Sequence, residues 1–136
     1  MDQNAKKRNE LLAQQMIKAL ESRNMEAYYA ENKEEALCKA LELMPEGSSV
    51  AWGGSMSVKE IGLIKAVHER NYEVYDRDLA KTPEERTEIT KKAFFSDFFL
   101  ASSNAITEDG ILVNIDGHAN RVAAIAYGPK NVLMII

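Results

Sequence analysis

Two stretches of the sequence carry residues that could bind a ligand, and the first is rich in glycine. Gly53-Gly54-Ser55-Met56-Ser57 lies between a predicted strand and a predicted helix. Ligands of open parallel sheets bind at the carboxyl ends of strands, and glycines there let the backbone approach an anion closely. The stretch matches neither the dinucleotide-binding fingerprint nor the Walker A loop. Two interpretations therefore stay open: a phosphate or carboxylate site at Gly53, Gly54 and Ser55, or a tight turn that needs small residues for packing.

The second stretch, residues 102–121, places polar side chains densely among strand-forming residues. Asn114 and Asp116 alternate with Val113 and Ile115, so we expect both polar side chains on one strand face. Such a face could hold a ligand, although Asp and Asn also stabilise turns by bonding to their own backbone. We expect the guanidinium of Arg121 to pair with a carboxylate or phosphate. The ligand-binding candidates of this stretch are Asn104, Asp109, Asn114, Asp116, Asn120 and Arg121.

Catalysis and metal binding find less support in the sequence. Glu108 and Asp109 are the candidate catalytic carboxylates, as a base or a nucleophile, but a sequence alone cannot reveal a shifted pKa. None of the serines lies in a G-x-S-x-G elbow. Asp116 and His118 lie two residues apart, but the segment lacks the order of a calcium loop, and no cysteine lies nearby for zinc. We predict neither a metal site nor a cofactor.

Composition limits the classes of function. The 136 residues suit one domain over 1–136, with 46% hydrophobic and 28% charged residues. A net charge of −4 argues against a nucleic-acid or anionic-membrane surface. No signal peptide and no stretch of about 18 apolar residues is visible, so we expect a cytoplasmic protein. Cys38 is the only cysteine, which excludes an internal disulfide, and we expect it buried on a helical face with Leu37 and Leu41.

Four helices are predicted from apolar spacing and from capping residues. The first spans 4–23. Asn32 caps the second, which Pro45-Glu46-Gly47 ends. Ser57 with Glu60 forms a capping box for the third, and Thr82-Pro83 with Glu85 begins the fourth, which runs to about Phe95.

Short apolar runs between these helices are predicted to be strands. A turn at 107–110 joins two of the runs into a hairpin. Helices that alternate with buried strands indicate a parallel sheet with helices on its faces. The predicted class is α/β, with a mostly parallel sheet flanked by helices, an N-terminal helix and a C-terminal β-hairpin region. The strand candidates are 25–30, on weak evidence, and 49–53, 72–75, 98–106, 111–115, 122–126 and 132–136.

Taken together, the two stretches resemble the lactate-utilisation (LUD) domain family. Trp52 to Ser57, followed by Glu60 to Leu63, is similar to a first family motif. The second motif is matched by Ser103 to Gly110, Leu112-Val113-Asn114, Asp116-Gly117 and Asn120 to Ala124, with Gly128-Pro129 completing it. The resemblance runs from the first helix to the last residue.

The resemblance implies a fold similar to ribose-5-phosphate isomerases and CoA transferases, with both motifs lining one pocket. It also implies a link to bacterial lactate utilisation, in which LUD proteins act beside iron–sulfur partners to oxidise lactate to pyruvate. Family members usually continue beyond the strand that corresponds to 132–136. The resemblance therefore predicts a LUD-like domain truncated at its C-terminus, and no cluster-binding tail can be carried over to this chain.

Three functions remain open. The leading hypothesis is an accessory or small-molecule-binding component of lactate utilisation that takes a small anionic molecule. The alternatives are a stand-alone CoA-transferase-like or sugar-phosphate-isomerase-like enzyme that uses Glu108 or Asp109, and an interaction protein with a vestigial pocket. The expected protein partners are an iron–sulfur subunit and, through pairing of an exposed final strand, a second copy of the chain.

Overall fold

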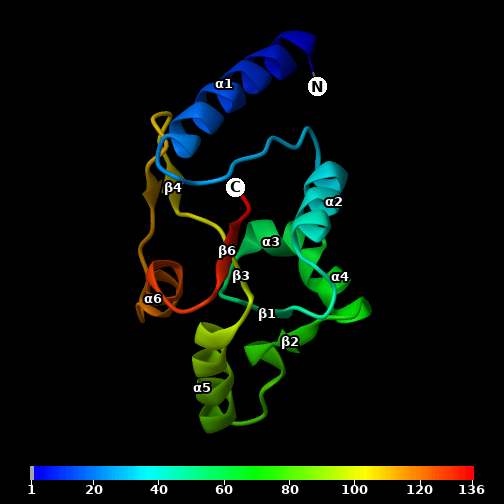
Figure 1. Ribbon diagram of the computed structural model, residues 1–136, viewed down its shortest axis with the longest axis vertical. Helices are drawn as coiled ribbons and strands as arrows, with labels where there is room; N and C mark the ends of the chain where they lie inside the picture. The colour runs from blue at the N-terminus through cyan, green and yellow to red at the C-terminus, as the bar shows by residue number, and fades with distance from the viewer. Residues whose placement is uncertain (1) are drawn as a thin grey trace.

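A four-stranded parallel sheet forms the centre of the protein in a computed structural model that describes residues 2–136 (Figure 1). The strands lie in the order β2-β1-β3-β6, and each neighbouring pair runs parallel. Parallel neighbours need crossover connections, which helices supply here. The predicted α/β class is thus confirmed. The strands are β1 (Ser49–Trp52), β2 (Glu73–Tyr75), β3 (Phe98–Ala101) and β6 (Asn131–Met134).

Helices cover both faces of this sheet (Figure 1). Alternating side chains separate two apolar clusters, with Val50 and Trp52 in one and Ala51 in the other. The first cluster includes residues of α2 (Lys33–Leu43), α3 (Met56–Glu60) and α4 (Leu63–Glu69). The second includes residues of the 3-10 helix η2 (Ala93–Phe95) and of α6 (Asn120–Ala126). The helix α5 (Pro83–Lys92) precedes η2, and a second 3-10 helix, η1 (Arg77–Leu79), follows β2.

The N-terminal helix α1 (Gln3–Glu21) lies apart from the sheet, beside the small antiparallel hairpin of β4 (Ala105–Ile106) and β5 (Leu112–Val113) (Figure 1). None of its residues is buried. Its end packs on the hairpin turn so closely that a Cβ at Gly110 would lie 3.0 Å from the Ala19 carbonyl carbon. Arg23 Nε also donates to the Asp109 carbonyl at 3.2 Å. The hairpin therefore anchors one end of α1.

Local capping chemistry places two helices where the sequence predicts them. The Asn32 side chain accepts a hydrogen bond from the Glu35 N–H at 2.9 Å, and α2 begins at the next residue. Thr82 Oγ1 accepts from the Glu85 N–H at 3.1 Å, and Pro83 opens α5. Each cap satisfies an N–H group that has no partner inside its helix. The start of α5 fixes which of its residues lie on the same side of the helix.

The third predicted helix is wrong in its start and its continuity. Ser55, not Ser57, caps it, with Ser55 Oγ accepting from the Val58 N–H at 3.3 Å. Gly62 then adopts a φ of +80° and divides the helix into α3 and α4. A left-handed backbone breaks the helical hydrogen-bond ladder, and glycine adopts it without steric cost.

The remaining corrections concern strands and one cysteine. Residues 25–30 form no strand, 98–106 is interrupted between β3 and β4, and 122–126 belongs to helix α6. Because β5 ends at Val113, Asn114 and Asp116 lie beyond it and do not share a strand face. Cys38 is exposed on α2, not buried. No helix among residues 2–136 is both long and apolar enough to cross a bilayer.

Candidate functional site

A cleft of about 560 Å³ opens beside the carboxyl ends of β1 and β2. The loop after β1 forms one wall through Gly53 and Gly54. Gly53 is buried, and a Cβ there would lie 3.6 Å from Phe99 Cζ and 3.8 Å from Arg121 Cβ. This close approach brings the glycine-rich stretch against the polar stretch at 102–121. Open parallel sheets usually bind ligands in the crevice at the carboxyl ends of their strands.

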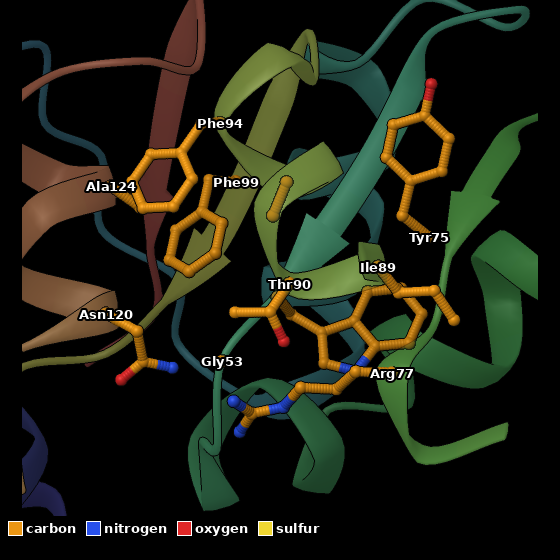
Figure 2. A pocket seen from close by; sticks show the side chains of 11 residues that line it. Gly53, Tyr75, Arg77, Ile89, Thr90, Phe94, Phe99, Asn120 and Ala124 are labelled. Carbon is orange, nitrogen blue, oxygen red and sulfur yellow. The ribbon is translucent and has the colours of Figure 1, made fainter. Parts of the chain in front are cut away.

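Arg77 reaches the cleft from η1, immediately after β2. Figure 2 shows its guanidinium turned toward the loop at Gly53, with Thr90 and Asn120 around the same space. Its NH2 atom would lie 3.6 Å from a Cβ at Gly54. The Nε atom is buried and has no hydrogen-bond partner among the described residues. A buried donor without a partner is costly, so an acceptor in the cleft would favour this guanidinium.

One face of α5 forms the opposite wall through Arg86, Thr87, Thr90 and Lys91. Residues 86 and 90 are four positions apart, as are residues 87 and 91, so the two pairs form adjacent rows along one side of the helix. Both threonine hydroxyls donate to carbonyls of their own helix, at 3.0 Å for Thr87 and 2.8 Å for Thr90. Arg86 pairs with Asp78 at 3.4 Å, whereas the Lys91 ammonium makes no ion pair or hydrogen bond within residues 2–136. The Lys91 ammonium is thus the free cation of this wall among residues 2–136.

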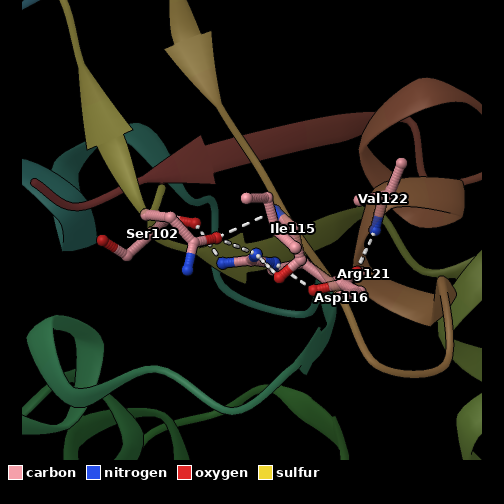
Figure 3. Close-up of polar contacts among 6 residues, drawn as sticks. Ser102, Ile115, Asp116, Arg121 and Val122 are labelled. Atoms are coloured by element: carbon pink, nitrogen blue, oxygen red, sulfur yellow. Dashed lines mark hydrogen bonds and ion pairs between the residues drawn. The ribbon is translucent and has the colours of Figure 1, made fainter.

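Arg121 closes the cleft from α6, and its donors bind its own chain (Figure 3). Its Nε donates to Asp116 Oδ1 at 2.9 Å, and its NH1 donates to the Ser102 carbonyl at 3.0 Å. NH2 donates to Asn104 Oδ1 at 2.5 Å and to the Ile115 carbonyl at 3.2 Å. The second carboxylate oxygen, Asp116 Oδ2, accepts from the Val122 N–H at 2.6 Å. Arg121 and Asp116 therefore tie the segment after β5 to β3 and α6.

The family model described as the LUD domain matches residues 13–136. The chain belongs to the LUD domain family. No curated protein and no solved structure matches the chain significantly. Both stretches and every residue that lines the cleft lie inside the matched region, so the cleft is part of the LUD domain itself.

The cleft of this LUD domain collects about half of the candidate ligand residues. Asn104 supports the wall by holding Arg121 and by accepting from the Ile115 N–H at 3.0 Å. Ser55 caps α3. Asn114 is half-buried with its Oδ1 unpartnered, away from the cleft lining. The candidates that line the cleft are Gly53, Gly54, Asp116, Asn120 and Arg121.

Glu108 and Asp109, the candidate catalytic carboxylates, lie outside the cleft lining. Both are exposed in the hairpin turn between β4 and β5, next to α1. The Thr107 hydroxyl donates to the Asp109 carboxylate, and this bond is the main reason that the pKa of Asp109 lies below its usual value. A carboxylate that stays ionised in this way is a weaker base.

The sequence-based predictions missed the cations of the LUD domain's cleft, Arg77, Arg86 and Lys91. The helix start at Thr82-Pro83 was a usable signal, because it fixes the phase of α5 and places 86, 87, 90 and 91 on one face. Arg77 offered no comparable signal, since it follows a short strand in a 3-10 turn. Within residues 2–136 no group of three His, Cys, Asp or Glu side chains is placed to hold a metal ion.

Proposed function

We propose that the chain binds a small anionic molecule in the cleft and serves lactate utilisation as an accessory or ligand-binding component. The observation that carries the proposal is the guanidinium of Arg77, whose buried Nε has no hydrogen-bond partner among the described residues and whose NH2 would lie 3.6 Å from a Cβ at Gly54. An anion in the cleft would give the free N–H groups of this guanidinium the acceptors that residues 2–136 do not supply. Membership of the LUD domain family supports the metabolic setting.

The charge distribution supports the same ligand class. Four cations, Arg77, Arg86, Lys91 and Arg121, line the cleft together with one carboxylate, Asp116. The whole chain carries a net charge of −4, so the cleft has the opposite sign to the rest of the protein. Clefts lined by one sign of charge raise the local concentration of ions of the opposite sign. A small anion is therefore the ligand that this cleft attracts best.

Binding, rather than turnover, is the function that we propose for the chain alone. Asp116 is the only carboxylate among the described residues that line the cleft, and hydrogen bonds from Arg121 and Val122 occupy both its oxygens. A general base needs a free oxygen within reach of the proton that it removes. In this proposal, oxidation of lactate belongs to an iron–sulfur partner, and the chain supplies the ligand site.

The proposal can be tested by thermal shift with lactate, pyruvate, sugar phosphates and acyl-CoA. A ligand at about 100 times its dissociation constant adds about 2.7 kcal/mol of stability, which moves the midpoint by several degrees. We expect Arg77→Gln to abolish the shift. Arg70→Gln is the matched control, because Arg70 is exposed and does not line the cleft.

The possible results of the thermal-shift experiment lead to different conclusions. A shift that is lost only in Arg77→Gln supports an anion site in the cleft. A shift that survives Arg77→Gln would place the ligand elsewhere, and silence with every compound would contradict ligand binding. The midpoint of each variant without ligand is measured first, so that a change in folding is not mistaken for a change in binding.

A further inference from the structure

The cleft holds more positive charge than one carboxylate can neutralise. Arg77 and Lys91 have no ion pair within the described residues, and the one partner of Arg86, Asp78, is an exposed group outside the cleft lining. Asp116 is already neutralised by Arg121 at 2.9 Å. A monocarboxylate such as lactate brings a single negative charge, which would leave one of the two unpaired cations, Arg77 or Lys91, uncompensated.

We propose that the ligand is a phosphate-bearing organic molecule, with its phosphate held between Arg77 and Lys91. This inference rests on the proposed anion-binding function and names the class of ligand. A phosphate monoester carries a charge of about −1.5 to −2 at pH 7 and three strong acceptor oxygens. It can accept hydrogen bonds from both cations at once, whereas the threonine hydroxyls of α5 donate to their own helix.

The two cations come from different walls of the cleft. Arg77 follows β2 and stands over Gly54, while Lys91 lies on the cleft face of α5. A group that bridges these walls must offer acceptors in more than one direction, which the tetrahedral oxygens of phosphate do. The planar guanidinium of Arg77 suits paired phosphate oxygens, and the flexible Lys91 ammonium supplies a point charge.

The cleft has room for a molecule larger than lactate or inorganic phosphate. Its volume of about 560 Å³ falls within the range of roughly 300–1,000 Å³ for pockets that enclose drug-sized ligands. Next to it, the recess drawn in Figure 2 has a free volume of only about 10 Å³, between Trp52 and Phe99. That space is close to the minimum for one water molecule. The organic part of the ligand therefore occupies the open cleft, on the side lined by Gly117 and His118.

Isothermal titration calorimetry of the intact chain tests this inference with glycerol 3-phosphate, inorganic phosphate, lactate and pyruvate as probes. We expect glycerol 3-phosphate to bind at least tenfold more tightly than lactate or pyruvate. Arg77→Gln and Lys91→Gln should each weaken glycerol 3-phosphate binding about tenfold. Lys92→Gln is the matched control, because this lysine neighbours Lys91 on α5 and does not line the cleft.

The failures of the two proposals are distinguishable. The phosphate inference is wrong, while anion binding stands, if lactate or pyruvate binds as tightly as glycerol 3-phosphate. The same holds if Lys91→Gln weakens the binding of glycerol 3-phosphate no more than Lys92→Gln does. If none of the four probes releases or absorbs heat of binding and none shifts the unfolding midpoint, anion binding in the cleft fails as well. Unchanged unfolding midpoints of the unliganded variants exclude misfolding as the cause of a lost signal.

Discussion

Replacing Arg121 with alanine should destabilise the fold strongly, because this side chain ties the segment after β5 to the end of β3 and to α6. Arg121 and Asp116 are each only 12% exposed, and four hydrogen bonds run from the guanidinium to the chain around it. Removing one partner of a buried ion pair costs about 3–5 kcal/mol, since the other charge stays buried without compensation. The remaining exposure lets water reach the pair, so we expect about 3 kcal/mol for Arg121→Ala.

Urea unfolding followed by fluorescence of the single tryptophan, Trp52, measures this loss. The double variant Arg121→Ala/Asp116→Ala is the informative control. Most of the expected loss comes from the stranded carboxylate, so the double variant should be more stable than Arg121→Ala alone. A loss under about 1 kcal/mol would show that the pair behaves as a surface ion pair. Independent, additive losses would show that the two residues do not act on each other.

Two further predictions concern packing and pH. Gly128→Ala should lower the urea midpoint more than Gly47→Ala. Both glycines have a positive φ, but only at Gly128 would a Cβ lie 2.9 Å from Phe94. Equal losses of stability would show that backbone strain alone decides the effect. The Ser49 N–H donates to Asp97 at 2.9 Å and is the main reason that the pKa of Asp97 is lowered. A lowered folded pKa gives stability that is present above the unfolded value of about 3.9 and is lost as pH falls below it. Asp97→Asn should therefore lower the urea midpoint at pH 7. Between pH 5 and pH 3 the urea midpoint should fall less for Asp97→Asn than for the unchanged protein. The same pH dependence in both proteins would contradict this account.

Local chemistry explains which parts of the fold the sequence could predict. A cap acts within four residues, so Asn32 and Thr82 reveal the starts of α2 and α5 without knowledge of the tertiary structure. The same logic erred at Ser57 because Ser55 offers an equally good hydroxyl two residues earlier. The break at Gly62 followed from a left-handed backbone, which a single glycine permits but does not require.

The segment 122–126 shows where periodicity fails. A short apolar run suits a buried strand or a buried helix equally, and its three alanines favour a helix by propensity. Packing against the sheet determines that the segment is a helix, because Ala124 is 2% exposed and packs in the cluster that contains Phe99. An α-helix fits here because small side chains let it lie close to the sheet.

The candidate site was predictable only in part for a related reason. Gly53 and Arg121 lie in stretches whose composition is unusual, so each stretch could be found alone. Their approach in space, so close that a Cβ at Gly53 would lie 3.8 Å from Arg121 Cβ, is set by the tertiary fold. Arg77 and Lys91 look like ordinary surface cations in the sequence, and only the fold shows that neither has a counter-charge of its own.

The absence of buried residues in α1 has a consequence for how stability is measured. A helix without buried residues is stabilised mainly by its own turns, so α1 can unfold while the sheet stays intact. We expect far-ultraviolet ellipticity to fall at a lower urea concentration than the fluorescence of Trp52, which is 4% exposed in the core. The two transitions should then not coincide, and a two-state fit to ellipticity would blend them. The indole signal reports the sheet that carries the cleft, and ellipticity alone understates its stability.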